Sequence, residues 1–218
     1  MWKNRTNSLY SDVPLMIGNT AQEVDLRPTP GESLKSWTQA DLRRYITKRL
    51  GPFGGSVANT SLTLYPWEKD AEYVFTTMTS DVRLICGTEL LANMASEALT
   101  SDVYRYVVES FPSSPVSGSG SSFDSSYAFH SWDSLAFFWS FDQLFNHRPN
   151  REDEKFGEII QTEMANFAKT GKPSDKNWYL YPNVTALISS DIMYTDAYHK
   201  HQCAFWIENG FLPYSWIN

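Results

Sequence analysis

Residues 103–108 form a run that is almost continuously apolar or aromatic. A short run of this kind is typical of a strand that is covered on both faces, as in a parallel sheet. Residues 13–18 are also predicted to form a strand, ended by Gly18 and Asn19, and a third strand is predicted near residues 185–189. Long segments with helical spacing lie between these strands. Strands that alternate with long helices predict an α/β fold, in which helices pack on a sheet.

Five segments are predicted helices: residues 38–50, 70–79, 81–99, 151–169 and 197–209. The clearest is the fourth, in which apolar side chains recur at helical spacing, acidic residues occupy the first turn and a glycine follows the end. Four of the helices have a side chain near the start that can accept a hydrogen bond from the first free N–H groups. These predicted caps are Thr38, Asp81, Asn150 and Asp196.

Residues 112–126 are rich in proline, serine and glycine and hold few apolar side chains. Such a segment has too little apolar surface to pack, so it is predicted to be a flexible, solvated loop. The chain shows no internal repeat. Its length of 218 residues suits one domain or slightly more.

Composition and charge exclude several classes of function. With 42% hydrophobic and 15% aromatic residues, the chain is globular rather than intrinsically disordered. A net charge of −7 argues against a nucleic-acid partner, because phosphate binding requires clustered lysine and arginine side chains. No run of about 20 apolar residues exists, so no segment is expected to span a membrane. The first five residues lack the apolar core of a signal peptide.

Four segments, taken together, resemble one protein family. Residues 14–23 (PLMIGNTAQE) resemble a strand and turn that deliver a catalytic acid, and residues 128–133 (AFHSWD) resemble a segment that carries a catalytic histidine. Residues 166–173 (NFAKTGKP) are similar to a characteristic helix end, and the surroundings of Cys86 and Cys203 resemble those of a late disulfide. The family is that of the type-B carboxylesterases, which includes the cholinesterases. The resemblance implies the C-terminal part of an α/β-hydrolase fold, with an incomplete central sheet and flanking helices.

The resemblance implies that Glu23 is the acid and His130 the base of a Ser-Glu-His catalytic triad. In that chemistry a neutral imidazole accepts the proton of the attacking hydroxyl, and the carboxylate orients the imidazole and stabilises its charged form. α/β-Hydrolases carry the serine on a strand-turn-helix segment before the acid. Too few residues precede Glu23 for such a segment, so the nucleophile and the oxyanion hole are expected to lie outside the chain. Asp133 is interpreted either as a hydrogen-bond acceptor near the base or as a solvated acid, and the sequence leaves both open.

One serine has surroundings that approach the nucleophile motif. Residues 54–58 read Gly-Gly-Ser-Val-Ala, but this segment follows a predicted helix and comes after the acid, which is the wrong order. We therefore interpret it as a loop. Triad chemistry needs no cofactor and no metal ion, and none is predicted. His199 and His201 cannot share an ion on a helix, because positions two apart point about 200° away from each other, and both are expected to be exposed.

Two positions differ from the family pattern. Val24 follows the acid and Ser131 follows the base, where glycine is usual in the family. The turn after Glu23 is therefore expected to differ. Cholinesterases place aromatic residues of the choline pocket just after the acid, whereas residues 25–30 hold no aromatic side chain. A general or lineage-specific esterase is expected rather than a choline-selective one.

The two cysteines, Cys86 and Cys203, are compatible with free buried thiols or with one disulfide. Their count alone favours thiols, whereas the matching family positions imply a bridge that closes a long loop. Glycosylation sequons at Asn4, Asn59 and Asn183 point to the secretory pathway, where disulfides form.

These residues leave three functions open. The first is the C-terminal portion of a secreted serine carboxylesterase, which acts on small-molecule carboxylic esters and is inactive without its nucleophile. The second is a non-catalytic adhesion or binding relative, as the neuroligins are in this family. Retention of Glu23 and His130 favours the first, because a binding protein needs neither side chain. The third, a stand-alone pseudo-enzyme, would expose an apolar sheet edge and aggregate. The final helix resembles one used in cholinesterase dimers, which predicts a homodimer.

Overall fold

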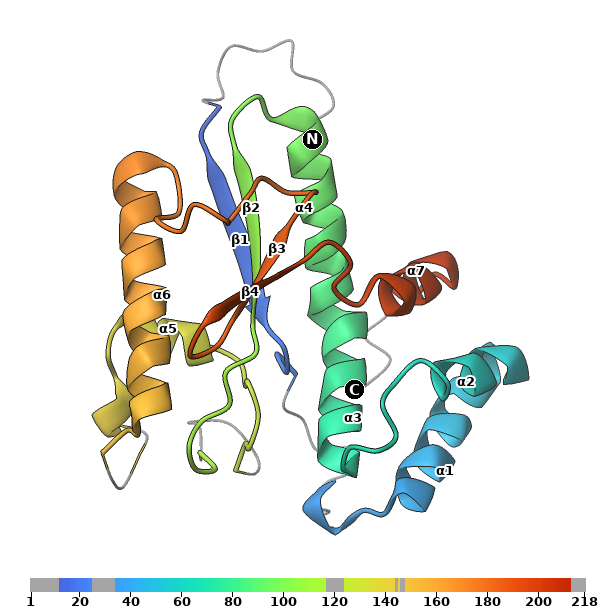
Figure 1. Cartoon of the computed structure of the whole chain (residues 1–218). Helices are drawn as coiled ribbons and strands as arrows, with labels where there is room; N and C mark the ends of the chain where they lie inside the picture. Colours follow the sequence, from blue (N-terminus) through green and yellow to red (C-terminus); the bar gives the residue numbers. More distant parts are fainter. Residues whose placement is uncertain (1–11, 25–33, 117–123, 144, 146–147, 213–218) are drawn as a thin grey trace.

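The computed structural model describes residues 12–24, 34–116, 124–143, 145 and 148–212. Its centre is a four-stranded sheet in the order β1-β2-β3-β4 (Figure 1). The strands are β1 (Leu15–Thr20), β2 (Val103–Val108), β3 (Thr185–Ile188) and β4 (Ile192–Thr195). β1, β2 and β3 run parallel, and β4 returns antiparallel to β3. The predicted α/β class is confirmed, although the sequence pattern did not predict β4.

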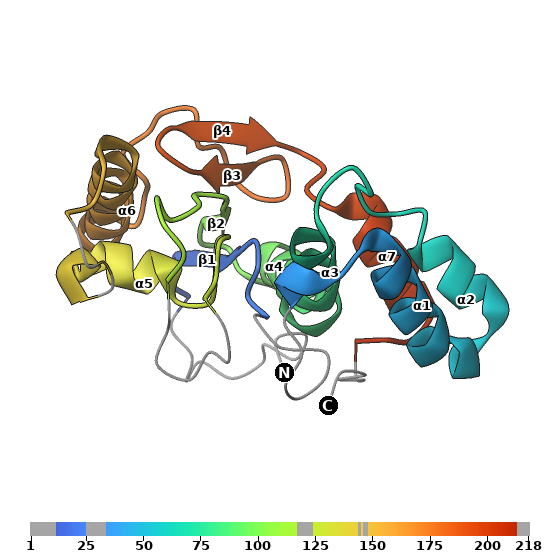
Figure 2. The same ribbon diagram turned by 90° about the horizontal axis from the view of Figure 1, so that it is seen from below.

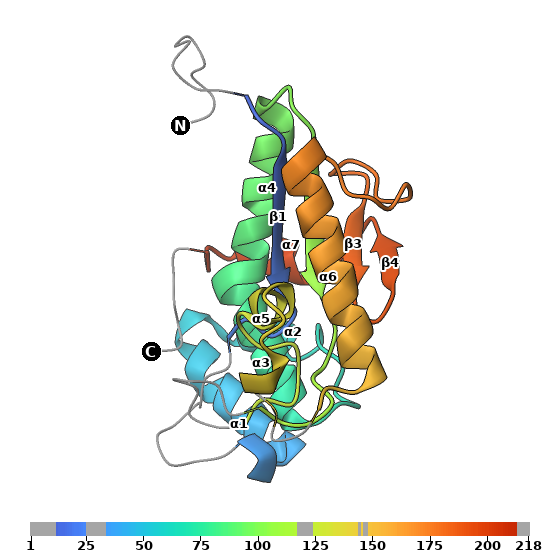
Figure 3. The same cartoon turned by 90° about the vertical axis from the view of Figure 1, so that its left-hand side faces the viewer.

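Helices cover both faces of this sheet. α4 (Cys86–Ala98) lies on one face, and α6 (Arg151–Thr170) with the short α5 (Trp132–Phe137) lies on the other, so that β1 stands between α4 and α6 (Figure 3). α1 (Gln39–Leu50), α2 (Gly55–Ser61) and α7 (Lys200–Glu208) lie on the side of α3 (Ala71–Ser80) and α4 that is away from α6 (Figures 1 and 2). The short 3-10 helices are Leu34–Ser36, Gly51–Phe53 and Phe141–Gln143. Every helix among the described residues is too short or too polar to cross a membrane.

Two capping boxes confirm predicted helix starts. Thr38 caps α1 by accepting a hydrogen bond from the Asp41 N–H, and the Asp41 carboxylate accepts one from the N–H of Thr38. Asn150 caps α6 in the same reciprocal way. Gly171 follows α6 with φ of 76°, a left-handed conformation that glycine adopts without a steric penalty. The ends of the longest helix are therefore set by its local sequence.

Two other predicted caps are wrong. Asp81 does not open a helix, because α3 continues through a π-helical turn (Asp81–Ile85) into α4, and Asp81 has helical φ and ψ of −57° and −52°. Asp196 does not cap α7, which begins at Lys200 directly after His199. The Asp81 side chain is fully buried. Its carboxylate accepts hydrogen bonds from side chains of other elements rather than from the backbone of its own helix.

β1 begins and ends later than predicted, and Gly18 lies inside it rather than at its end. Gly18 stands opposite Tyr106 in the register of β1 and β2. A Cβ atom at Gly18 would lie 2.5 Å from the Tyr106 ring, so glycine lets this ring lie across β1. Contrary to the sequence prediction, Gly18 therefore does not end the strand. It is the position at which the Tyr106 side chain approaches the backbone of β1.

The described parts of the loop at residues 112–126 are joined to each other. Val116 and Ser125 form an antiparallel bridge with two backbone hydrogen bonds of 2.9 Å. Val116 is buried in the main apolar cluster of the protein. Residues 117–123 lie outside the described residues. The two ends of the loop are thus fixed to the core.

A disulfide joins α7 to α4. The bond between Cys86 and Cys203 agrees with the pairing that the family resemblance implied and excludes two free thiols. Both cysteines are buried, and the bond closes a separation of 117 residues. α7 is thereby held covalently against the helices at the side of the sheet.

A chain of hydrogen bonds also joins α7 to the π-helical turn between α3 and α4, which begins at Asp81. The Trp206 indole N–H donates to the Tyr65 hydroxyl at 2.7 Å, and that hydroxyl donates to Asp81 Oδ2 at 2.9 Å. The other oxygen of Asp81 lies 2.8 Å from His199 Nδ1. His199 is half-buried in the position before α7, so the prediction of an exposed helix residue is wrong for it, whereas His201 is exposed.

The Asp81–His199 contact makes the stability of the fold depend on pH. Burial alone lowers the pKa of His199, but the charge and hydrogen bond of Asp81, helped by Glu109 and opposed by Arg105, raise this pKa above its usual value of 6.5. With a raised pKa in the folded state, the stabilisation is fully present below about pH 6.5 and is lost as the pH rises through the folded-state pKa. We expect the free energy of unfolding, measured with urea, to fall across that window.

Two variants test the origin of this pH dependence. His199→Asn should remove the part of the fall that begins near pH 6.5, because asparagine does not titrate. His201→Asn changes an exposed histidine on α7 and should leave the profile as in the wild type. Identical profiles for the wild type and His199→Asn would contradict the role assigned to the pair.

Candidate active site

The carboxylate of Glu23 is fixed close to the end of β1. The backbone N–H of Thr20, the last residue of β1, donates to Glu23 Oε1 at 2.8 Å. The Glu23 side chain is only 10% exposed. This contact uses one carboxylate oxygen and leaves the other for a second partner.

His130 is that second partner. It lies in the segment that leads into α5, and its Nδ1 atom is 2.6 Å from Glu23 Oε2, although the two residues are 107 positions apart. The fold therefore brings the predicted acid and the predicted base into hydrogen-bond contact. The His130 side chain is 71% exposed, so a reactant can approach the ring while Glu23 holds Nδ1. An imidazole held in this way has its second nitrogen available for proton transfer.

The two departures from the family pattern have different structural consequences. Ser131 adopts φ of 69° and ψ of 10°, a left-handed conformation that costs a non-glycine residue roughly 1–2 kcal/mol. Glycine after the base would avoid this cost. Val24 has a negative φ, so its backbone does not require glycine. Its N–H donates to Ser80 Oγ on α3 at 2.9 Å. Val24 itself is therefore bound to α3, and the residues that follow it lie outside the described residues.

Asp133 contacts Tyr106 rather than His130. Asp133 Oδ2 accepts a hydrogen bond from the Tyr106 hydroxyl at 2.9 Å, and Oδ1 accepts one from the Ser134 N–H at 2.7 Å. Burial, followed by the charge of Asp133, raises the pKa of Tyr106 well above its usual value, so the hydroxyl remains a donor. Asp133 thus ties the first turn of α5 to β2, and no direct bond to the imidazole is found among the described residues.

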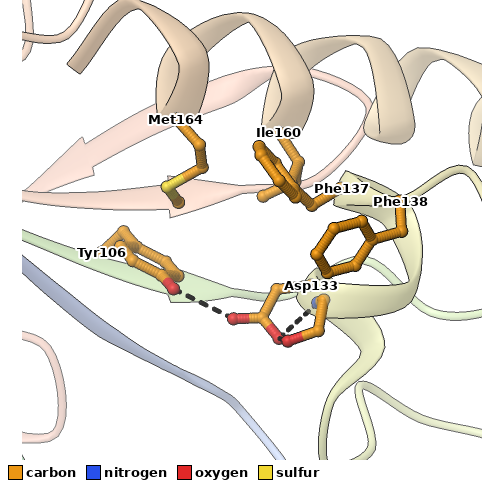
Figure 4. Close-up of a pocket in the computed structure, with 7 residues that line it drawn as sticks. Tyr106, Asp133, Phe137, Phe138, Ile160 and Met164 are labelled. Carbon is orange, nitrogen blue, oxygen red and sulfur yellow. Dashed lines mark hydrogen bonds between the residues drawn. The ribbon is translucent and has the colours of Figure 1, made fainter. Parts of the chain in front are cut away.

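A cavity of about 240 Å³ lies beside this contact, between β2, α5 and α6 (Figure 4). Its lining is mostly apolar and consists of Tyr106, Asp133, Ser134, Phe137, Phe138, Ile160 and Met164. In Figure 4 the Asp133 carboxylate points towards the Tyr106 hydroxyl, so the charged group of the lining is engaged within the protein. The cavity borders the elements that position His130 and does not include His130 or Glu23.

Ser56, which the sequence order excludes as the nucleophile, and the described sequon residues Asn59 and Asn183 lie in other parts of the fold. Ser56 is exposed in the first turn of α2, so the interpretation of residues 54–58 as a loop is wrong. α2 packs on α1 at the side of the molecule away from α6 (Figures 1 and 2). Asn59 is exposed in α2, Asn183 is exposed before β3, and Asn4 and residues 25–30 lie outside the described residues. In the part of the chain that the structure describes, no group of three His, Cys, Asp or Glu side chains could hold a metal ion.

Sequence reasoning missed three polar residues around the acid. Gln22, Thr77 and Ser80 are buried, and they link the turn after β1 to α3. Gln22 stands directly before the predicted acid, which is the only signal that the sequence offers. Its partner Thr77 is 55 positions away, so no local pattern reveals the contact.

Three parallel strands, a carboxylate after β1 and an imidazole in the segment between β2 and α5 define the C-terminal part of an α/β-hydrolase fold. Comparison with known proteins agrees with this class. The model of the carboxylesterase family matches residues 4–206, and the chain belongs to that family, the type-B carboxylesterases. No curated protein sequence matches the chain.

Solved structures of esterases show the same fold. A PNB esterase has a TM-score of 0.56 and 24% sequence identity, and the match covers 88% of this chain and 38% of that chain. For EstA of Aspergillus niger the TM-score is 0.65 at 16% identity, with coverage of 90% and 40%. An esterase from Clostridium hathewayi that can hydrolyze aliphatic aromatic polyesters has a TM-score of 0.59 at 14% identity, with coverage of 89% and 37%. The chain thus spans between 37% and 40% of the length of these structures, and its sheet corresponds to part of their larger fold.

Proposed function

We propose that this chain is the C-terminal portion of a secreted serine carboxylesterase that acts on small-molecule carboxylic esters. The observation that carries the proposal is the 2.6 Å contact between Glu23 Oε2 and His130 Nδ1, on an imidazole whose side chain is 71% exposed. Membership of the carboxylesterase family supports an ester as the substrate.

In the proposed mechanism His130 acts first as a base and then as an acid. The imidazole accepts the proton of a serine hydroxyl as the oxygen attacks the ester carbonyl, and it then gives this proton to the leaving alcohol. Glu23 accepts a hydrogen bond from Nδ1–H, which selects the tautomer whose other nitrogen is free to accept a proton. Its negative charge also stabilises the imidazolium that forms. The second carboxylate oxygen stays bound to the Thr20 N–H, so the carboxylate cannot rotate away.

The serine nucleophile and the oxyanion-hole donors are proposed to come from a part of the protein outside these 218 residues. In α/β-hydrolases the nucleophile precedes the acid in the chain, and one donor of the oxyanion hole precedes the nucleophile. The PNB esterase is matched over only 38% of its length, which is compatible with an upstream portion that supplies both.

A non-catalytic adhesion protein of the same family is less well supported. Such a protein has no use for an acid and a base in contact. The hydrogen bond between Glu23 and His130 is made across 107 positions and includes an exposed imidazole, which a purely structural role does not require.

We further propose that the protein folds in the secretory pathway and carries glycans at Asn4, Asn59 and Asn183. The bond between Cys86 and Cys203 supports an oxidising compartment, and the exposure of Asn59 and Asn183 supports access for glycosylation. A homodimer through α7 is proposed from the resemblance to cholinesterases alone. Mass spectrometry of the protein from a eukaryotic host, with and without glycosidase treatment, tests the glycans.

Purified alone, the 218-residue chain is expected neither to hydrolyse p-nitrophenyl acetate nor to react with a fluorophosphonate probe. One oxyanion-hole donor is worth about 3–4 kcal/mol, and both the donors and the nucleophile are proposed to lie elsewhere. The full-length protein should do both, with labelling at a serine outside these residues. Circular dichroism establishes that the shorter chain is folded when it is assayed. Stoichiometric labelling of Ser56, or of any other serine in this chain, would overturn the proposal.

A further inference from the structure

Gln22 joins the segment of the acid to the segment of the base. Its backbone N–H donates to the Ala128 carbonyl at 2.9 Å, and its side-chain Oε1 accepts from the Ala128 N–H at 3.0 Å. Its side-chain Nε2 donates to Thr77 Oγ1 on α3 at 3.1 Å. Gln22 thus satisfies both backbone polar groups of Ala128 and rests on a third element of the fold.

These hydrogen bonds are made away from water. The exposed fractions of Gln22, Ala128 and Thr77 are 1%, 0% and 2%. A buried donor or acceptor that loses its partner costs about 1–3 kcal/mol, so the Gln22 side chain is held in one arrangement. An exposed glutamine would exchange such bonds for bonds to water at little cost.

The residues that these hydrogen bonds join, Gln22 and Ala128, are close to Glu23 and His130 both in the sequence and in space. Gln22 directly precedes Glu23, and Ala128 precedes His130 by one intervening residue, Phe129. A parallel bridge between Gln22 and Phe129 sets the two segments side by side. Because the imidazole of His130 is 71% exposed, little packing holds the ring. Its place depends on the backbone of its own segment and on the bond to Glu23.

We propose that Gln22 is a positioning residue for the acid–base pair, an inference that rests on the proposed esterase function. Gln22 fixes the segment of His130 relative to that of Glu23, and Thr77 orients the Gln22 amide. An amide can accept from the Ala128 N–H and donate to Thr77 at the same time, whereas an ionised carboxylate has no proton to donate. A glutamate would also bury a second negative charge beside Glu23.

Gln22→Met in the full-length protein tests the proposal, because methionine keeps the approximate length and loses both side-chain hydrogen bonds. A misplacement of about 1 Å can cost about 100-fold in rate, so we expect kcat to fall by about 100-fold. KM should change little because Gln22 is only 1% exposed, so a substrate cannot contact its side chain. The proton NMR signal of His130 Nδ1–H, which reports its bond to Glu23, should weaken or shift upfield.

Gln202→Met is the matched control. The Gln202 amide also ties a helix to a distant carbonyl, that of Leu64, at 3.0 Å, but it belongs to α7. This variant should keep the wild-type kcat and the wild-type His130 signal. Thr77→Val keeps both bonds between Gln22 and Ala128 and removes only the support of the amide, so it should give a smaller fall in kcat.

The outcomes separate this inference from the proposed function. A folded Gln22→Met protein with wild-type kcat and an unchanged His130 signal would overturn the positioning role. If Gln22→Met does not fold, Thr77→Val decides: a lower kcat with a disturbed His130 signal supports the role, and wild-type values for both overturn it. Activity that survives His130→Ala would instead refute the proposed function. The His130 signal of the Gln22→Met protein, in which the imidazole is retained, would still test the positioning role of Gln22.

Discussion

Replacing His130 with alanine in the full-length protein is expected to lower kcat/KM by about four to six orders of magnitude. His130 is proposed to take the proton of the serine and return it to the leaving alcohol, and alanine can do neither. The loss should fall mainly on kcat, because proton transfer contributes in the transition state rather than in substrate binding. Hydrolysis of p-nitrophenyl acetate measures the effect.

Two further variants sharpen this result. Glu23→Gln should cost about 10⁴-fold in kcat, since a neutral amide favours neither the productive tautomer nor the imidazolium. His201→Ala removes an exposed imidazole from α7 and should retain the wild-type rate. A near wild-type rate for His130→Ala would remove His130 from the mechanism and leave the contact with Glu23 as a structural one.

The second large effect concerns the disulfide. The double variant Cys86→Ala, Cys203→Ala is expected to lose about 4–5 kcal/mol of unfolding free energy, because the bridge no longer restricts the unfolded chain over a long loop. The separation of 117 residues sets this magnitude. Urea denaturation of the oxidised wild type and of the double variant measures the difference directly.

The reduced wild type is the control for that measurement. Reduction removes the same covalent link without changing a side chain at either position, so it should cause most of the same loss. Both cysteines are buried, and truncation to alanine therefore adds a small cavity cost that reduction does not. A loss below about 1 kcal/mol in both cases would show that the bridge does not constrain the unfolded chain as the loop-entropy relation requires.

The parts of the fold that local sequence determines were predictable. β2 follows from six residues of which all but one are apolar or aromatic, and α6 follows from its capping box, its acidic first turn and its terminal glycine. The identities of Glu23 and His130 came from the family resemblance rather than from any local pattern. Their 2.6 Å contact depends on the sheet, which brings together segments 107 positions apart.

Other features depend on tertiary contacts that no local pattern reports. Asp81 has the sequence context of a helix cap. Its buried carboxylate instead forms hydrogen bonds with His199 and Tyr65, which are distant in the sequence. Gly18 has the context of a strand end, but the Tyr106 ring needs the space above it. β4 is a four-residue strand, Ile-Met-Tyr-Thr, and so short an apolar run does not by itself distinguish a strand from another partly buried segment.

The bond between Cys86 and Cys203 has a consequence for how the protein survives proteolysis. A single cut at any peptide bond between these two residues leaves two polypeptides that remain one molecule until they are reduced. When the cut falls before His130, the carboxylate and the imidazole reside on different polypeptides that are still covalently linked. A nicked preparation would then migrate as one band on a non-reducing gel and separate into two bands only after a thiol is added.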